Sequence, residues 1–135
     1  MGAMTISREV ISQLRSIGLF RVLAEYDEEC RYFVATCLET GSVATADSPE
    51  LLKEAVLDLL DEEIIHAAIH GDIAGLFSHQ APKDVWSRWI RAVGETTPET
   101  LSLRLRLQAL FVQEKLAENP LDQTPEVAFA LAKAA

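Results

Sequence analysis

The sequence predicts an all-α protein, a compact single-domain bundle of about six helices that spans residues 1–135. Its first support is a repeated helix-start signal: a hydroxyl residue that can cap the helix, then proline, then glutamate near the positive end of the helix dipole. The signal occurs three times, as Ser48-Pro49-Glu50, Thr97-Pro98-Glu99 and Thr124-Pro125-Glu126. Residues typical of helix ends follow the apolar segments at Gly18, Gly41, Gly71, Gly94 and Asn119-Pro120. A hydrophobic content of 49% in 135 residues is enough to bury one core without disulfide or metal cross-links.

These start and end signals define the individual helices. We expect them at residues 7–17, 19–40, 49–70, 82–93, 98–118 and 125–134, with a short turn near residues 73–79. In the second helix, apolar residues separated alternately by four and three positions predict a seam that packs lengthwise against a neighbour. This seam contains Leu19, Leu23, Tyr26, Cys30, Phe33 and Cys37, so both cysteines are expected to be buried. The apolar stripe of the fourth helix contains Trp86, Trp89, Ile90 and Val93.

The fifth helix requires a choice, because residues 101–109 alternate between apolar and polar types as a strand does. A helix is favoured because the segment 98–118 has no helix breaker after Pro98 and is rich in Leu, Gln, Glu and Ala. On a helix it has two apolar faces, which is typical of a central helix or of one shared with a second subunit. The second face, a candidate surface for self-association as a homodimer, contains Leu103, Leu107, Leu110 and Phe111.

The net charge of -9 is concentrated in the middle of the chain. Residues 25–72 contain thirteen Asp and Glu against two Lys and Arg, whereas residues 73–135 contain seven of each. A pI near 4.7 argues against a broad nucleic-acid-binding surface and against an anionic membrane surface, because both need many exposed basic residues. We therefore expect neither nucleic acid nor a membrane among the partners.

The predicted helix 49–70 carries one carboxylate per turn along an acidic row. The row consists of Glu50, Glu54, Asp58 and Glu62, with Asp61 beside it. Like charges at this spacing destabilise a helix by roughly a few tenths of a kcal/mol per pair. The ordinary interpretation is a solvated helix face, and the functional one is a docking surface for a protein partner with a basic surface.

The same helix contains a candidate metal site. Glu63, His66 and His70 continue its apolar face toward the C-terminus, where hydrophobic residues would be expected. Glu-x-x-His on an inward face is one of the two such motifs that di-iron carboxylate bundles use together with two further glutamates, and imidazoles one turn apart can chelate iron or zinc. The sequence has no second Glu-x-x-His, and Asp27 is the best additional carboxylate.

A structural role is the competing interpretation of these residues. His70 immediately precedes Gly71 and could cap the last carbonyls of the helix, and Glu63 could pair with Arg104 or Arg106. The chain has no nucleophile motif, Gly-rich phosphate loop or Cys-x-x-Cys pair, which argues against an enzyme.

The N-terminal sequence and the apolar runs bear on localisation. The start Met-Gly-Ala-Met resembles a vector remnant followed by a native initiator, Met4, and no signal-peptide core or apolar run of roughly 18 residues follows. We expect a small, acidic, cytoplasmic interaction or regulatory domain without enzymatic activity, which docks a basic partner through helix 49–70. The alternative is a metal-binding bundle or metalloenzyme that uses Glu63, His66 and His70 with iron or zinc.

Overall fold

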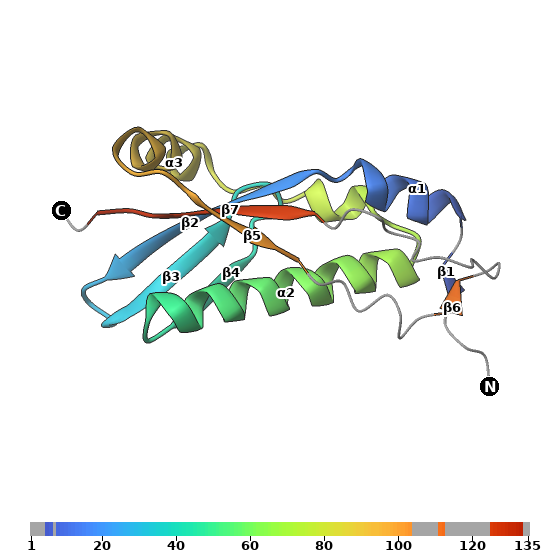
Figure 1. The fold of residues 1–135 in the computed structure, drawn as a ribbon, viewed down its shortest axis with the longest axis horizontal. Coiled ribbons are helices and arrows are strands. Elements are labelled where there is room, and N and C mark those ends of the chain that lie inside the picture. The colour runs from blue at the N-terminus through green and yellow to red at the C-terminus, as the bar shows by residue number, and fades with distance from the viewer. Residues whose placement is uncertain (1–4, 7, 104–110, 113–124, 134–135) are drawn as a thin grey trace.

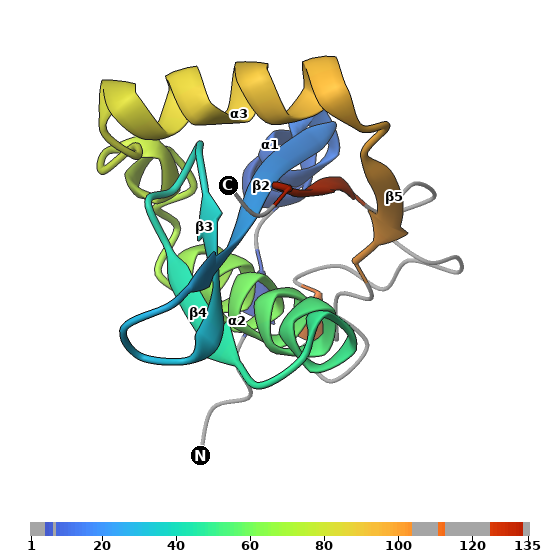
Figure 2. The same ribbon diagram turned by 90° about the vertical axis from the view of Figure 1, so that its left-hand side faces the viewer.

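The computed structural model describes residues 5–6, 8–103, 111–112 and 125–133, and it overturns the predicted fold class. The described chain is an α/β fold built on a five-stranded mixed sheet, not an all-α bundle. One long helix lies against one face of this sheet and a shorter helix lies across the other face (Figure 1, Figure 2). The described part of the chain therefore has three layers.

The helices and strands alternate irregularly along the chain. The helices are α1 (Arg8–Ser16), α2 (Pro49–Ile69) and α3 (Lys83–Glu95), with a short 3-10 helix, η1, at Ala74–Phe77. The main sheet contains β2 (Leu19–Asp27), β3 (Tyr32–Cys37), β4 (Val43–Ala46), β5 (Glu99–Ser102) and β7 (Glu126–Leu131). The two-residue strands β1 (Thr5–Ile6) and β6 (Phe111–Val112) form a separate parallel pair.

This element order confirms some predicted helices and overturns others. The helices expected at 7–17, 49–70 and 82–93 are α1, α2 and α3, and the expected turn near 73–79 contains η1. The helices expected at 19–40 and 125–134 are wrong, because both segments form strands of the main sheet. The helix expected at 98–118 is wrong wherever this segment is described, because residues 99–102 form β5, residue 103 is not helical and residues 111–112 form β6. Residues 104–110 and 113–118 lie outside the described residues.

The sheet has the strand order β4-β3-β2-β7-β5, with β2 in the centre. Strand β2 pairs antiparallel with β3 and parallel with β7, and Phe20 lies opposite Val127 in the parallel pair. Strands β4 and β5 are antiparallel to β3 and β7, respectively, and form the two edges. The centre of the sheet thus joins segments from nearly opposite ends of the sequence.

The segment expected to be helix 19–40 is a β-hairpin whose turn is stabilised by Asp27. The Oδ1 atom of Asp27 accepts hydrogen bonds from the backbone N–H groups two and three residues later, at 3.0 and 3.2 Å. Arg31 completes the turn with a φ of 58°, in the left-handed region. Cys30 is exposed in this turn, which contradicts the prediction that it is buried, whereas Cys37 on β3 is buried as expected.

Only the first of the three helix-start signals begins a helix. Ser48 accepts a hydrogen bond on its hydroxyl from the backbone N–H of Leu51 at 3.2 Å and thereby caps α2. The signals at Thr97-Pro98-Glu99 and Thr124-Pro125-Glu126 lead into β5 and β7 instead. A residue before proline favours extended backbone, which suits the entry to a strand as well as the cap of a helix.

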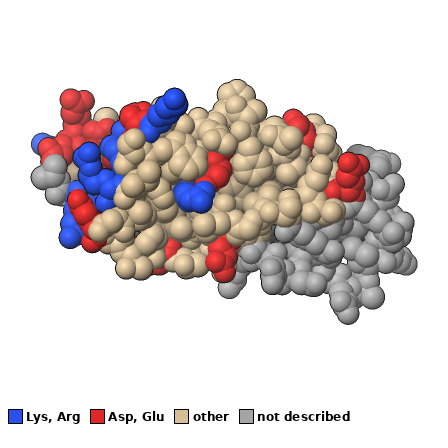
Figure 3. All heavy atoms as spheres, turned by 90° about the horizontal axis from the view of Figure 1, so that it is seen from above, with Lys and Arg blue, Asp and Glu red and all other residues tan. Residues whose placement is uncertain are grey.

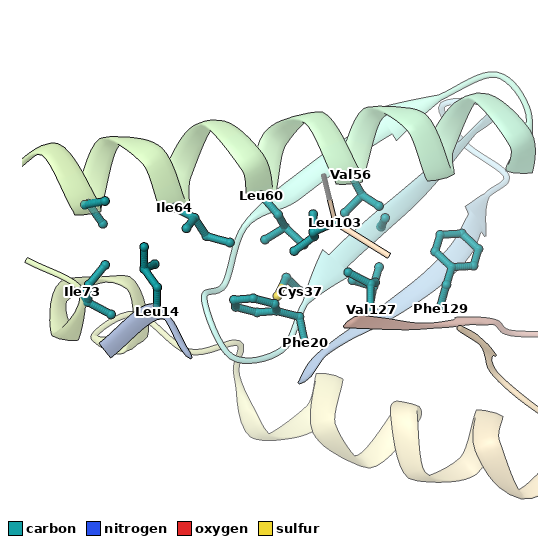
Figure 4. Close-up of a cluster of buried hydrophobic side chains, with 14 of the residues drawn as sticks. Leu14, Phe20, Cys37, Val56, Leu60, Ile64, Ile73, Leu103, Val127 and Phe129 are labelled. Carbon is teal, nitrogen blue, oxygen red and sulfur yellow. The ribbon is translucent and has the colours of Figure 1, made fainter. Parts of the chain in front are cut away.

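The largest core cluster fills the space between α2 and the sheet. Val56, Leu60 and Ile64 project from α2 toward Phe20 and Val127 on the strands, as Figure 4 shows. Each fully buried side chain of this size contributes roughly 1.5–3 kcal/mol. The stripe of α2 that was expected to be apolar is therefore the surface that attaches the helix to the sheet.

A second, smaller core cluster attaches α3 to the other face. Leu23 of β2 is buried there together with Val85 and Trp89 of α3. Trp86 is partly buried, so both tryptophans pack as expected, but Ile90 is 67% exposed and does not belong to the core.

Two ion pairs join elements across the α3 face. Arg88 donates from Nε to Glu25 on β2 at 2.9 Å and from Nη1 to Asp84 at 2.8 Å, and it holds the pKa of the Asp84 carboxyl below its usual value. Arg21 donates its backbone N–H and Nη1 to the buried carboxylate of Glu39, at 2.7 and 2.6 Å. Both pairs hold β2 to a neighbouring element.

The buried thiol of Cys37 predicts a loss of stability at alkaline pH. Burial raises the pKa of this thiol from 9.0 to about 11. Between about pH 9 and about pH 11 the thiol therefore ionises in the unfolded chain but stays protonated in the folded one, so the free energy of unfolding falls as the pH rises. We expect Cys37→Ala to remove roughly 2–3 kcal/mol of this pH dependence, measured by urea unfolding at each pH. An identical profile for wild type and Cys37→Ala would contradict the prediction.

Candidate functional site

All three histidines of the chain line one cavity with a volume of about 840 Å³. His66 and His70 come from the C-terminal end of α2, and His79 comes from the segment between η1 and α3. Other polar residues of the lining are Thr40, Ser42, Glu62, Glu63, Asp72 and Ser78, and no Lys or Arg is among the lining residues that the structure describes. The structure thus brings the predicted residues Glu63, His66 and His70 to one site.

Glu63 is held by the turn between β3 and β4. Ser42 donates a hydrogen bond from Oγ to the Oε2 atom of Glu63 at 2.5 Å. The Ser42 hydroxyl also lies 2.7 Å from Oγ1 of Thr40, which accepts a bond from the backbone N–H of Ser42 at 3.3 Å. This hydroxyl pair positions the Glu63 carboxylate at the wall of the cavity.

Gly41 allows the same turn to approach the segment that carries His79. Its φ is 74°, and a Cβ atom at this position would lie 2.1 Å from the backbone oxygen of His79. One step further, the backbone N–H of Ala81 donates to the carbonyl of Leu38 at 2.9 Å. The third histidine is therefore positioned by close backbone packing rather than by its own helix.

His66 and His70 lie against each other at the end of α2. Their ring centroids are 4.2 Å apart with an angle of 38° between the planes. His70 donates its backbone N–H to the carbonyl of His66 at 3.1 Å, and its Nδ1 lies 2.9 Å from the same oxygen. His70 therefore caps the helix, as its position before Gly71 suggested.

The cavity does not contain a preformed three-ligand metal centre. Within the ranges that the structure describes, no group of three or more His, Cys, Asp or Glu side chains is arranged to hold a metal ion. Glu63 is engaged by Ser42, and Asp27 bonds its own hairpin turn at the opposite end of the β2–β3 hairpin. Arg104 and Arg106, the alternative partners considered for Glu63, lie outside the described residues.

The acidic row lies on the outer face of α2. Glu50, Glu54, Asp58 and Glu62 are all exposed, while the residues that pack on the sheet lie on the opposite face of the helix. Asp61 is only 5% exposed and is not part of this surface. At about 100° per residue its direction around α2 falls between those of Glu50 and Glu54, so helical spacing alone does not account for its burial.

The predicted self-association surface loses its basis as a helical face. Leu103 is fully buried in the core of its own chain, and Phe111 lies in β6. Leu107 and Leu110 lie outside the described residues. Self-association stays a prediction that sedimentation at high protein concentration would test, but Leu103 cannot contribute to it.

A second cavity of about 690 Å³ lies at the other end of α2, and the sequence did not indicate it. Its apolar lining comes from Tyr26, Phe33, Phe129 and Leu131, and Lys53 lies over the Phe129 ring at 5.7 Å. These residues come together only because β7 pairs with β2. In the same way, His79 joins the cavity that His66 and His70 line through tertiary packing that no local motif could have revealed.

Comparisons with known proteins give no relative from which a function could be transferred. No family model, curated protein or solved structure matches this chain. None of the described helices is both long enough and apolar enough to cross a membrane.

The bond from Ser42 to Glu63 predicts a measurable contribution to stability. We expect Ser42→Ala to lower the free energy of unfolding by about 1 kcal/mol, because a partly buried carboxylate loses a hydrogen-bond donor. Chemical unfolding measures the change. Ser78→Ala, which removes an exposed hydroxyl from the same cavity, should cost less than about 0.5 kcal/mol. Equal losses of unfolding free energy for the two variants would show that the hydrogen bond to Glu63 does not stabilise the fold more than an exposed hydroxyl does.

Proposed function

We propose that the protein is a small, non-enzymatic interaction domain of the cytoplasm that docks a partner with a basic surface through the outer face of α2. The observation that supports this proposal is the exposure of Glu50, Glu54, Asp58 and Glu62 along one side of a single rigid helix. The opposite side of α2 is used for packing on the sheet. The helix therefore presents its carboxylates on a fixed support.

The charge on the two faces of the molecule differs. The exposed Asp, Glu, Lys and Arg residues of α2 are all acidic, whereas Lys53 is partly buried and reaches Glu99 of β5 at 3.0 Å. The face that carries α3 has basic and acidic side chains side by side, as Figure 3 shows at the end where α3 lies. A surface of one sign attracts an oppositely charged partner and speeds the encounter, and salt weakens this attraction.

The docking surface is tested with octalysine as a basic probe. We expect binding that weakens steeply as salt is raised, and Glu54→Gln with Glu62→Gln should reduce affinity at least fivefold at low salt, measured by isothermal titration calorimetry. The matched control is Glu28→Gln with Glu29→Gln, which removes the same charge from the exposed hairpin turn. Equal effects of the two double variants would mean that only the net charge matters, and the proposed surface would be rejected.

A second candidate function is metal or small-ligand binding in the histidine cavity. The specific observation is that two imidazoles 4.2 Å apart share one cavity with His79, Asp72 and a carboxylate pair, Glu62 and Glu63. Imidazole and carboxylate are suitable donors for zinc or iron(II). Because Glu63 bonds Ser42 and His70 caps the helix, a bound ion would have to compete with these existing bonds.

The metal hypothesis is tested by titrating tag-free protein with zinc chloride or iron(II). We expect one ion per chain and a raised melting temperature, both lost in the double variant His66→Ala, His70→Ala, because this variant removes the adjacent nitrogen ligands. Cys30→Ala, which removes an exposed thiol in the distant hairpin turn, should bind as the wild type does. Wild-type protein that shows neither heat nor a thermal shift would eliminate this second function.

A further inference from the structure

Strand β4 is an edge of the main sheet without the features that usually protect an edge. Its sequence, Val43-Ala44-Thr45-Ala46, contains neither a charged residue nor proline. Val43 is 55% exposed, and among the described strands none pairs with the outer side of β4. The other edge, β5, begins with Glu99, whose carboxylate pairs with Lys53. The two edges therefore differ in their readiness to accept another strand.

The backbone of β4 directs hydrogen-bonding groups outward at Val43 and Thr45. The backbone N–H of Cys37 donates to the carbonyl of Ser42 at 2.8 Å, and that of Leu38 donates to Arg21 on the other side of β3 at 2.8 Å. Both bonds are consistent with one pattern, in which alternate residues of β4 direct their backbone N–H and C=O groups to β3. Ala44 is one of these residues. The N–H and C=O groups of Val43 and Thr45 then point to the free edge, where an additional strand would bond them.

An additional strand at this edge would run along one flank of α2. The sheet curves around α2, so that β4 lies beside the helix, as Figure 2 shows. Glu63 bonds Ser42 next to β4, whereas Lys53 reaches Glu99 of β5. The side of α2 that carries Glu63 therefore faces the β4 edge of the sheet, and the side that carries Lys53 faces the β5 edge. Beyond Glu63 on the β4 flank, Leu51 and Glu62 are exposed and lie within about 20° of each other around the helix.

The charge of this flank selects the occupant. Two copies of this chain paired through β4 would place their α2 helices side by side on one face of a continuous sheet. Each copy carries a net charge of -9 and an acidic row on that helix, so the copies would repel each other. A strand that carries Lys or Arg on the side of α2 would instead meet the carboxylate of Glu62, and its apolar residues on the other face of the sheet would lie beside Val43.

We propose that the basic partner docks by adding one of its β-strands to β4, with basic side chains directed to the acidic flank of α2. This inference rests on the proposed function and specifies how the partner binds. Main-chain hydrogen bonds at Val43 and Thr45 supply affinity in this mode, and the alternating side chains of the added strand supply selectivity.

The test uses an octapeptide of alternating lysine and valine, with octalysine as the reference probe. Thr45→Pro removes the outward N–H while leaving the bonds to β3 intact, so it should weaken octapeptide binding at least tenfold and leave octalysine binding unchanged. Thr45→Ala, which keeps the N–H, should bind both probes within twofold of the wild type. Circular dichroism and the melting temperature verify that both variants fold.

Amide hydrogen exchange by NMR reads the same contact directly. In the wild type, the amides of Val43 and Thr45 should exchange at least tenfold more slowly when the octapeptide is bound, while Ala44 is protected with or without it. Unchanged octapeptide affinity in a folded Thr45→Pro variant would overturn strand addition and leave the acidic docking surface intact. Failure of both probes to bind would overturn both proposals, and a dimer that Thr45→Pro dissociates would assign the edge to a second copy.

If Thr45→Pro does not fold, the exchange measurement on the wild type decides between the outcomes. Slower amide exchange on octapeptide binding that is confined to Val43 and Thr45 supports the added strand. NMR chemical-shift changes that are confined to the carboxylate residues of α2 overturn it.

Discussion

The burial of β2 on both of its faces determines the arrangement of the other elements. Phe20, Val22 and Ala24 face the cluster under α2, while Leu23 faces the cluster under α3. A strand with apolar side chains on both faces needs a cover on each, and strands β3 and β7 occupy both of its edges. Once α2 lies along one face, its C-terminal end meets the β3–β4 turn, and the histidine cavity forms at that junction.

The same property explains which part of the fold the sequence could predict. Helix α2 was predictable because Ser48 caps it and its apolar residues recur with helical spacing. Strand β2 was not, because the continuous run Val22-Leu23-Ala24 lacks the alternation that identifies a half-buried strand. The heptad-like spacing from Leu19 to Cys37 is a coincidence that extends across a hairpin turn. Proline preceded by threonine is equally suited to begin β5 and β7, so it could not distinguish strand from helix.

The candidate site divides in the same way between local and tertiary information. Glu63, His66 and His70 share a helix, so their spacing alone was sufficient to place them together. Ser42 and His79 reach the cavity from separate segments, and their roles depend on the β3–β4 turn and on the absence of a side chain at Gly41. Neither charge nor helical spacing could separate the exposed row from the buried Asp61, because its direction around α2 falls between those of Glu50 and Glu54.

The parallel pairing of β2 with β7 has a consequence for the order in which the chain can fold. During synthesis β2 emerges before its partner strand, Glu126–Leu131, and β3, β4, α2, α3 and β5 are made between them. Until then the central strand has an open edge, and the nucleus of the sheet is limited to the β2–β3–β4 meander with α2 packed on it. Contacts between such distant segments close slowly because the loop entropy must be lost before the pairing is gained. Before β7 is added, the central strand of the sheet, which has apolar side chains on both faces, therefore keeps one unpaired edge, and the five-stranded sheet is completed only by a late pairing of distant segments.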